Sequence, residues 1–135
     1  MSGTVRFEVP VEVAFDYLVD PHHRPEWQSS LARVDDVDGE PRVGQTWTDV
    51  TVPGLRPAMR TTALDRPHRW SEVGTWHGVA AELTLAFRPA GPAACDVDCT
   101  FTIRVLGPVG RLATLVSGPA VRADLRRAAR LVAAR

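Results

Sequence analysis

Apolar and polar positions alternate with two different periods along this chain, and the changes of period mark its elements. Residues 4–9 alternate one by one, which predicts a first strand. Over residues 10–20 four apolar side chains recur at helical spacing, which predicts a short amphipathic helix: Val11, Ala14, Phe15 and Leu18. Pro21 and Pro25 bracket a second, shorter helical piece that carries Trp27. The chain therefore begins with a strand and two short helices.

From about Leu31 the period changes to two, and a run of strands follows. Turn-forming pairs such as Asp38-Gly39, Pro53-Gly54 and His77-Gly78 separate five or six of them. We place these strands near residues 30–38, 44–53, 57–66, 68–76, 78–88 and 95–106. The last one alternates apolar with polar side chains, as an antiparallel sheet with one buried face requires.

The tail, residues 109–135, has a helical pattern with an apolar stripe and a row of arginines on another side. Gly118-Pro119 is expected to kink this helix or to break it into two pieces. The order of elements predicts an α+β fold in one domain, 1–135, with a single antiparallel sheet and a helix lying across it. A strongly curved sheet wrapped around that helix would leave a cavity between them.

Composition places the chain among ordinary globular domains. It has 135 residues, of which 44% are hydrophobic and 24% charged, and this excludes a disordered or fibrous protein. The formal net charge of +0 gives no global attraction to nucleic acid or to anionic lipid. The start has no apolar signal core, and the longest uncharged helical stretch is about half a membrane span. We therefore expect a cytoplasmic protein without membrane insertion, as a monomer or a homodimer.

The metal- and cofactor-binding motifs that a sequence can reveal are absent. Cys95 and Cys99 would lie about 13 Å apart on one face of a strand, too far for a disulfide, which needs Cα atoms within about 7 Å. His22 and His23 have no partner at metal-ligand spacing. There is no Gly-rich phosphate loop, Gly-x-Ser-x-Gly elbow, Cys-x-x-Cys or His-Glu-x-x-His motif. We therefore expect no metal and no cofactor.

Aromatic side chains are the first candidates for ligand binding. All four tryptophans fall between residues 27 and 76, and Trp70 and Trp76 share a face if one strand holds both. Together with nearby apolar residues they would line a pocket for a flat or apolar ligand, or else fill the core of a small domain. The candidate lining residues are Trp27, Trp47, Trp70, Trp76, Leu85, Cys99, Phe101, Leu112, Leu115 and Val116.

Three titratable residues are weak candidates for acid–base chemistry. Asp49 lies on the same strand face as Trp47, and Glu72 on the same face as Trp70, so both acids point inward if the tryptophans do. A carboxyl group in an apolar cavity has a raised pKa, which suits a general acid or base. With one strand between them, a ligand could sit between the two acids. In the alternatives both acids face solvent, or one of them pairs with an arginine such as Arg60. His77, at an expected hairpin tip, is the third candidate.

At this point the sequence resembles a known family. The stretch Val9-Pro10-Val11-Glu12-Val13-Ala14-Phe15-Asp16-Tyr17-Leu18-Val19-Asp20-Pro21, followed by Arg24-Pro25-Glu26-Trp27, resembles the opening of START-like proteins of the polyketide cyclase/dehydrase type, in the SRPBCC superfamily. Val43-Gly44-Gln45-Thr46-Trp47 and Leu64-Asp65-Arg66-Pro67-His68-Arg69-Trp70 are similar to two of its later motifs, and Gly107 with the amphipathic tail matches its end. The order of these motifs carries the resemblance.

The resemblance implies a helix-grip fold, in which a curved seven-stranded antiparallel sheet grips the C-terminal helix around an apolar cavity. Family members bind lipids, polyketides or other hydrophobic molecules, and some catalyse cyclisation, aromatisation or dehydration. The first hypothesis is therefore a protein that binds a hydrophobic or aromatic small molecule. The alternatives are a cyclase-, aromatase- or dehydratase-type enzyme and a protein-interaction module. An enzyme should place an acid or base with a shifted pKa in the cavity, whereas a carrier should keep Asp49 and Glu72 on the solvated face.

Overall fold

The computed structural model describes residues 2–105 and 109–135, with the side chains of the last helix described from Pro119 onward. In chain order its elements are β1 (Ser2–Phe7), α1 (Val11–Val19), the 3-10 helix η1 (Pro21–His23), α2 (Arg24–Trp27), β2 (Leu31–Asp35), β3 (Thr46–Thr51), β4 (Ala58–Asp65), β5 (Arg69–Trp76), β6 (Val79–Pro89), β7 (Cys95–Arg104) and α3 (Val109–Ala133). The expected order is confirmed, although the second helical piece divides into η1 and α2, and the first strand begins and ends two residues earlier than expected.

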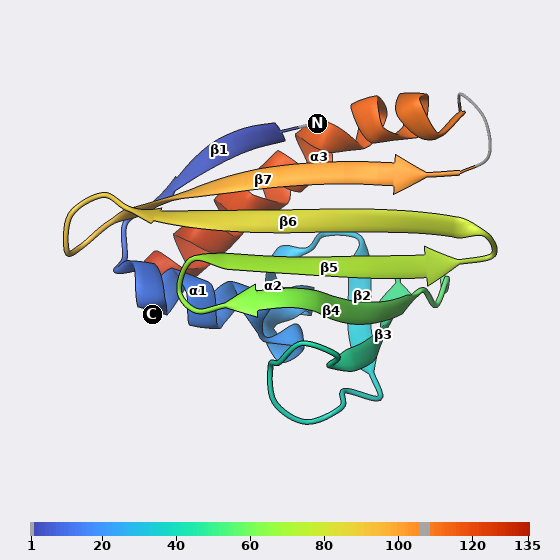
Figure 1. Ribbon diagram of the computed structural model, residues 1–135, viewed down its shortest axis with the longest axis horizontal. Coiled ribbons are helices and arrows are strands. Elements are labelled where there is room, and N and C mark those ends of the chain that lie inside the picture. The colour runs from blue at the N-terminus through green and yellow to red at the C-terminus, as the bar shows by residue number, and fades with distance from the viewer. Residues whose placement is uncertain (1, 106–108) are drawn as a thin grey trace.

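The strands form one antiparallel sheet in the order β1-β7-β6-β5-β4-β3-β2 (Figure 1). Strands β2 to β7 follow one another as a meander, and β1 pairs with the last strand, so that Phe7 lies opposite Cys95. Between β5 and β6 the turn is formed by His77 and Gly78, both with positive φ, as a two-residue hairpin of this twist requires.

The two faces of the sheet differ as the alternation predicts. On the outer face of β7, Asp96 pairs with Arg6 at 2.6 Å and Asp98 pairs with Arg88 at 2.9 Å. On the inner face Val97 and Cys99 are buried. Cys95 and Cys99 are both free thiols on this strand, which confirms that they do not pair with each other.

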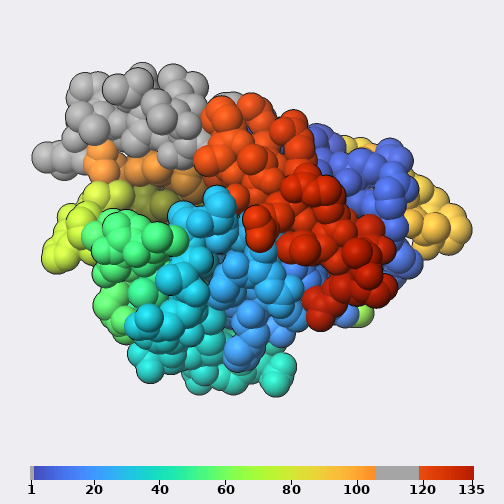
Figure 2. Space-filling model, turned by 180° about the vertical axis from the view of Figure 1, so that it is seen from behind, coloured from blue at the N-terminus to red at the C-terminus, as the bar shows by residue number. Residues whose placement is uncertain are grey.

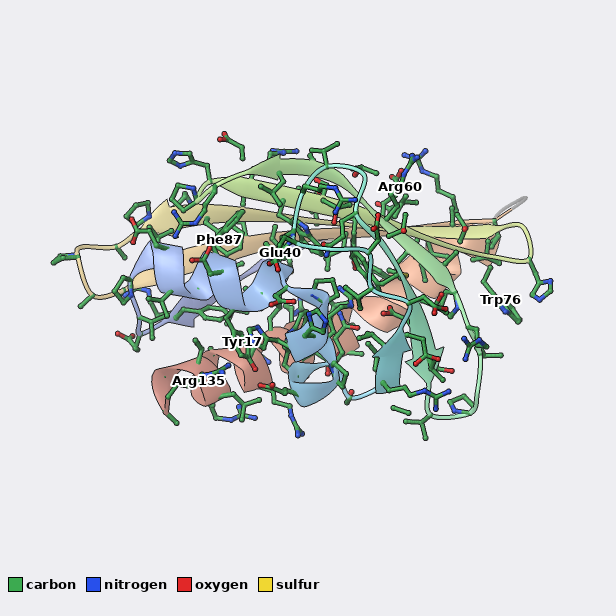
Figure 3. All side chains as sticks on the ribbon, turned by 90° about the horizontal axis from the view of Figure 1, so that it is seen from below. Tyr17, Glu40, Arg60, Trp76, Phe87 and Arg135 are labelled. Carbon is green, nitrogen blue, oxygen red and sulfur yellow. The ribbon has the colours of Figure 1, made fainter. Side chains whose placement is uncertain are left out.

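All helices cover the inner face of the sheet (Figure 3). Helix α1 packs the ring of Phe15 edge-on against Phe87 of β6, with centroids 5.0 Å apart. Helix α3 lies against β1 and β7 and contributes Leu125 and Ala128, both fully buried, to the same core cluster. The seven-stranded curved sheet with its terminal helix confirms the helix-grip α+β architecture.

Helix α3 runs from Val109 to Ala133 with Pro119 inside it, so the expected break into two helices is wrong, and the kink, which was the other expectation, stays a prediction. Proline removes one backbone hydrogen bond, but the segment that follows is rich in alanine and arginine, which favour helix, and its apolar side is held in the core. The side chains of Leu112, Leu115 and Val116 lie outside the described residues. Within the described chain, no helix is both long and apolar enough to cross a membrane.

Candidate ligand-binding pocket

A pocket of about 470 Å³ lies between the inner face of the sheet, the segment after α2, and α3. Its described apolar lining comes from β2, β4 to β7, the β3–β4 loop, α2 and α3: Trp27, Leu31, Leu55, Pro57, Met59, Trp76, Val79, Ala81, Leu83, Phe101, Ala120 and Val121. In Figure 2, which shows the helical side, the red part of α3 lies beside the light-blue segment after α2. Ser29 of that segment donates a 2.8 Å hydrogen bond to Asp124 of α3, and both residues belong to the lining.

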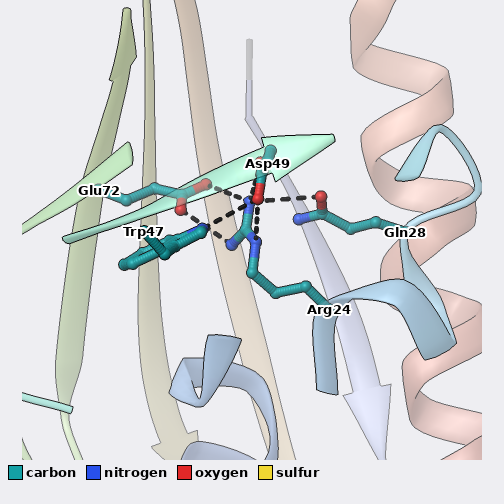
Figure 4. A network of polar contacts seen from close by, with 5 residues as sticks. All are labelled: Arg24, Gln28, Trp47, Asp49 and Glu72. Carbon is teal, nitrogen blue, oxygen red and sulfur yellow. Dashed lines mark hydrogen bonds and ion pairs between the residues drawn. The ribbon is translucent and has the colours of Figure 1, made fainter. Parts of the chain in front are cut away.

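A buried ionic cluster forms part of the pocket wall (Figure 4). The guanidinium of Arg24 donates to Glu72 from Nη1 at 2.8 Å and from Nη2 at 3.2 Å. It also donates to Asp49 from Nη2 at 3.1 Å and from Nε at 3.3 Å. Nη2 further contacts the Gln28 amide oxygen at 3.3 Å. One positive group therefore bridges two carboxylates.

The local structure of the chain delivers Arg24 to this place. The Asp20 side chain accepts the backbone N–H of His22 and so caps η1, whose first residue is Pro21. Arg24 follows directly as the first residue of α2. Its side chain reaches strands β3 and β5, from which Asp49 and Glu72 project inward.

The cluster is almost completely withdrawn from water, since the relative exposures of Arg24, Asp49 and Glu72 are 2%, 5% and 5%. The pKa of Glu72 is raised from 4.5 to about 7. Burial is the largest cause, the positive charge of Arg24 opposes it, and the negative charge of Asp49 adds to it. Burial opposes the charge of Arg24, but the two carboxylates more than offset this and leave its pKa raised. Because two acids share one guanidinium, the cluster carries a net negative charge when both are ionised, and protonation of one acid makes it neutral.

Trp47 supports this cluster from the same strand as Asp49. Its Nε1–H donates to Asp49 Oδ1 at 2.9 Å, and the guanidinium carbon of Arg24 lies 5.2 Å from the centre of its ring. Asp49 thus accepts from both Trp47 and Arg24, whereas the described partner of the Glu72 carboxylate is Arg24 alone. Trp47 also borders a second, shallower hollow of about 410 Å³ with Arg60.

The structure separates the sequence-predicted lining residues into three groups. Trp27, Trp76 and Phe101 line the pocket. Trp47, Trp70, Leu85 and Cys99 are buried in the core cluster and are not among the described lining residues, which corrects the expectation for these four. The side chains of Leu112, Leu115 and Val116 lie outside the described residues.

Trp70, Leu85 and Cys99 alternate inward as expected, but they lie farther along the strands. They are opposite one another in the sheet, one inward row beyond Glu72, Leu83 and Phe101, which line the pocket.

The three acid–base candidates also separate. Asp49 and Glu72 face inward and line the pocket, which is one of the two phases that the sequence left open and not the solvated face expected for a carrier. The space between them holds Arg24 rather than a ligand, which corrects the expectation of a ligand between the acids. Arg60, considered as a partner, is exposed on the opposite face of β4. His77 is exposed at the hairpin tip, packs edge-on against Trp76 at 4.5 Å, and is not among the described lining residues.

Sequence reasoning missed Arg24 and Gln28. The signal available in the sequence was the pair of carboxylates on the strand faces of Trp47 and Trp70. If both point inward, their charge must be balanced by a buried cation. Arg24 lies three residues before Trp27, in the segment after the first helix. Among the described residues, no group of three or more His, Cys, Asp or Glu is arranged to hold a metal ion.

A helix-grip protein with a pocket between sheet and helix is the class that these observations define. The sequence matches a family profile described as polyketide cyclase / dehydrase and lipid transport, over residues 1–135. The chain therefore belongs to this family. No curated protein matches the sequence significantly.

Solved structures with the same fold include proteins of different kinds. The protein XoxI from Bacillus cereus is 9% identical, with a TM-score of 0.78, and the alignment covers 98% of this chain and 94% of that one. Norcoclaurine synthase from Thalictrum flavum, in complex with dopamine and hydroxybenzaldehyde, is 14% identical, with a TM-score of 0.74 over 100% of this chain and 86% of that one. The di-domain ARO/CYC protein BexL of the BE-7585A biosynthetic pathway is 15% identical, with a TM-score of 0.78 over 96% of this chain and 45% of that one.

Proposed function

We propose that this protein binds a hydrophobic or aromatic small molecule in the pocket between the sheet and α3. The observation that carries the proposal is the pocket wall itself: a volume of about 470 Å³, lined mainly by apolar side chains, with the buried charged groups Arg24, Asp49 and Glu72 gathered in one cluster. Ligand pockets generally have this size and this division between an apolar wall and a small number of placed polar groups.

A neutral fluorescent probe tests the proposal. N-phenyl-1-naphthylamine, which brightens in apolar surroundings, should bind the wild-type protein in a 1:1 ratio. Ala81→Phe adds a ring to a lining position of β6 and should abolish this binding. Ala86→Phe on the outer face of the same strand is the matched control and should bind the probe like wild type. A wild type that binds no probe, or an Ala81→Phe variant that binds it equally well, would contradict the proposal.

A second candidate function rests on one specific observation. Glu72 lines the pocket with a pKa raised by burial to about 7, so both of its protonation states are populated near neutral pH. That is the property of a general acid or base, and it meets the condition set for a cyclase- or dehydratase-type enzyme. In such a reaction Glu72 would move a proton at the bound ligand, while Arg24 and Trp47 hold Asp49 as the fixed counter-charge.

Ligand extraction followed by an activity assay separates the two functions. Molecules extracted from the purified protein, or found by the probe assay, would be incubated with wild type and with Glu72→Gln, and their masses followed over time. An enzyme should convert the ligand in the wild type and lose this activity in Glu72→Gln while still binding. A binding protein should return the molecule unchanged from both.

A further inference from the structure

The charges around the pocket are unbalanced. The charged side chains in its described lining are Arg24, Asp49, Glu72 and Asp124, which give one positive and three negative groups when all are ionised. Asp124 stands on α3 across from the cluster, where its carboxylate accepts from the Ser29 backbone and hydroxyl. The polar part of the wall is therefore negative above neutral pH.

The single guanidinium in this described lining is already shared by two carboxylates. Each of its three nitrogens donates to at least one of them: Nε to Asp49, Nη1 to Glu72, and Nη2 to both. Nη1 carries two N–H groups and has one described acceptor, so at most a single N–H remains for a ligand. An incoming carboxylate that used this N–H would add a third negative group beside Asp49 and Glu72, and like charges placed together in a desolvated site repel each other strongly.

The remaining hydrogen-bonding capacity suits a donor on the ligand. The Glu72 oxygens accept from Arg24 alone among described residues, and each carboxylate oxygen can accept more than one bond. The indole N–H of Trp27, a buried lining residue, has no described partner. Its nitrogen is buried, so it presents no donor to a ligand carboxylate in the pocket. A hydroxyl or amine group can donate to Glu72, whereas an ionised carboxylate has no proton to donate.

We propose that the pocket selects its ligand by charge: it accepts neutral or cationic apolar molecules that carry a hydroxyl, phenol or amine group, and it excludes carboxylates such as fatty acids. This inference rests on the proposed binding function and narrows it to a ligand class. Glu72 is the specificity-determining residue, because its carboxylate is buried and accepts two hydrogen bonds, whereas that of Asp49 accepts three.

A matched ligand series tests charge selection separately from binding itself. The probes are 2-naphthalenemethanol, 2-naphthalenemethylamine and 2-naphthoate at pH 8, each measured by displacement of N-phenyl-1-naphthylamine. The alcohol and the amine should bind at least about tenfold more tightly than the carboxylate. Equal affinities for all three would overturn charge selection and leave the binding function standing. A protein that binds neither the dye nor any of the three would overturn both.

Two variants identify the source of the selectivity. Glu72→Gln keeps the shape and the Arg24–Asp49 pair, and it should improve carboxylate binding at least about fivefold relative to the alcohol. Glu82→Gln removes an acid from the outer face of the neighbouring strand and should leave the ratio unchanged. If both variants change the ratio equally, the effect comes from overall charge, and the assignment to Glu72 is wrong. The wild-type series decides the class of ligand even if a variant folds poorly.

Discussion

Arg24 donates to both carboxylate oxygens of Glu72, with Nη1 at 2.8 Å from one and Nη2 at 3.2 Å from the other, and neither residue is more than 5% exposed. This pair joins the short helix α2 to the middle of the sheet. It also brings charged groups to the wall of an otherwise apolar pocket. Stability, proton binding and ligand choice should therefore all depend on it.

Removal of Arg24 should destabilise the fold strongly. Arg24→Met leaves Asp49 and Glu72 buried without a counter-charge, and losing one partner of a buried ion pair costs about 3–5 kcal/mol. The free energy of unfolding from urea denaturation at pH 8 measures the effect, which should shrink at pH 5 as Glu72 takes up a proton. Arg66→Met, which breaks an exposed pair with Asp16, is the control and should change far less. Equal losses of unfolding free energy in the two variants would show that the buried cluster contributes no more to stability than an exposed ion pair.

Glu72 should make the protein less stable as the pH rises. Its pKa is raised from 4.5 to about 7 on folding, so its protonation stabilises the folded state fully below about pH 4.5, and this contribution is lost as the pH rises through 7. The whole change is at most about 3 kcal/mol, from the shift of pKa. Glu72→Gln should remove this slope from the unfolding free energy measured between pH 4.5 and 8, whereas Glu82→Gln should keep it. A Glu72→Gln profile parallel to wild type would refute the raised pKa.

Trp47 should matter for stability. Trp47→Phe keeps an aromatic ring but loses the 2.9 Å bond to Asp49, and hydrogen bonds to charged groups contribute about 1.5–3 kcal/mol. Thermal and urea denaturation should show a loss of this size. An unchanged unfolding free energy would mean that the bond to Asp49 contributes nothing.

Trp76 should matter for binding instead. It lines the pocket but is 39% exposed, so it stands at the edge of the domain. Trp76→Ala should weaken the binding of N-phenyl-1-naphthylamine about fivefold to tenfold, because the ligand loses an aromatic contact, and should change the unfolding free energy little. Unchanged probe affinity would place the ligand away from this end of the pocket.

The sequence alone predicts the strands well because their alternation reports directly on one buried and one solvated face. Alternation places Asp49 and Glu72 on the same strand faces as Trp47 and Trp70 but leaves open which face is buried, and the structure shows that it is this one. The sequence does not predict the partner of these acids, since Arg24 comes from a short helix whose position against the sheet depends on long-range packing. Nor does alternation show how far along a strand a pocket extends: Leu85 and Leu83 share a face, yet only Leu83 is among the described lining residues.

The most direct test of the central claim is a crystal structure of the protein with 2-naphthalenemethanol. We predict that the naphthalene ring lies between Trp76, Leu83 and Phe101, with its hydroxyl group within hydrogen-bonding distance of Glu72. A ligand bound elsewhere on the protein, with the pocket empty in the same crystal, would contradict the account.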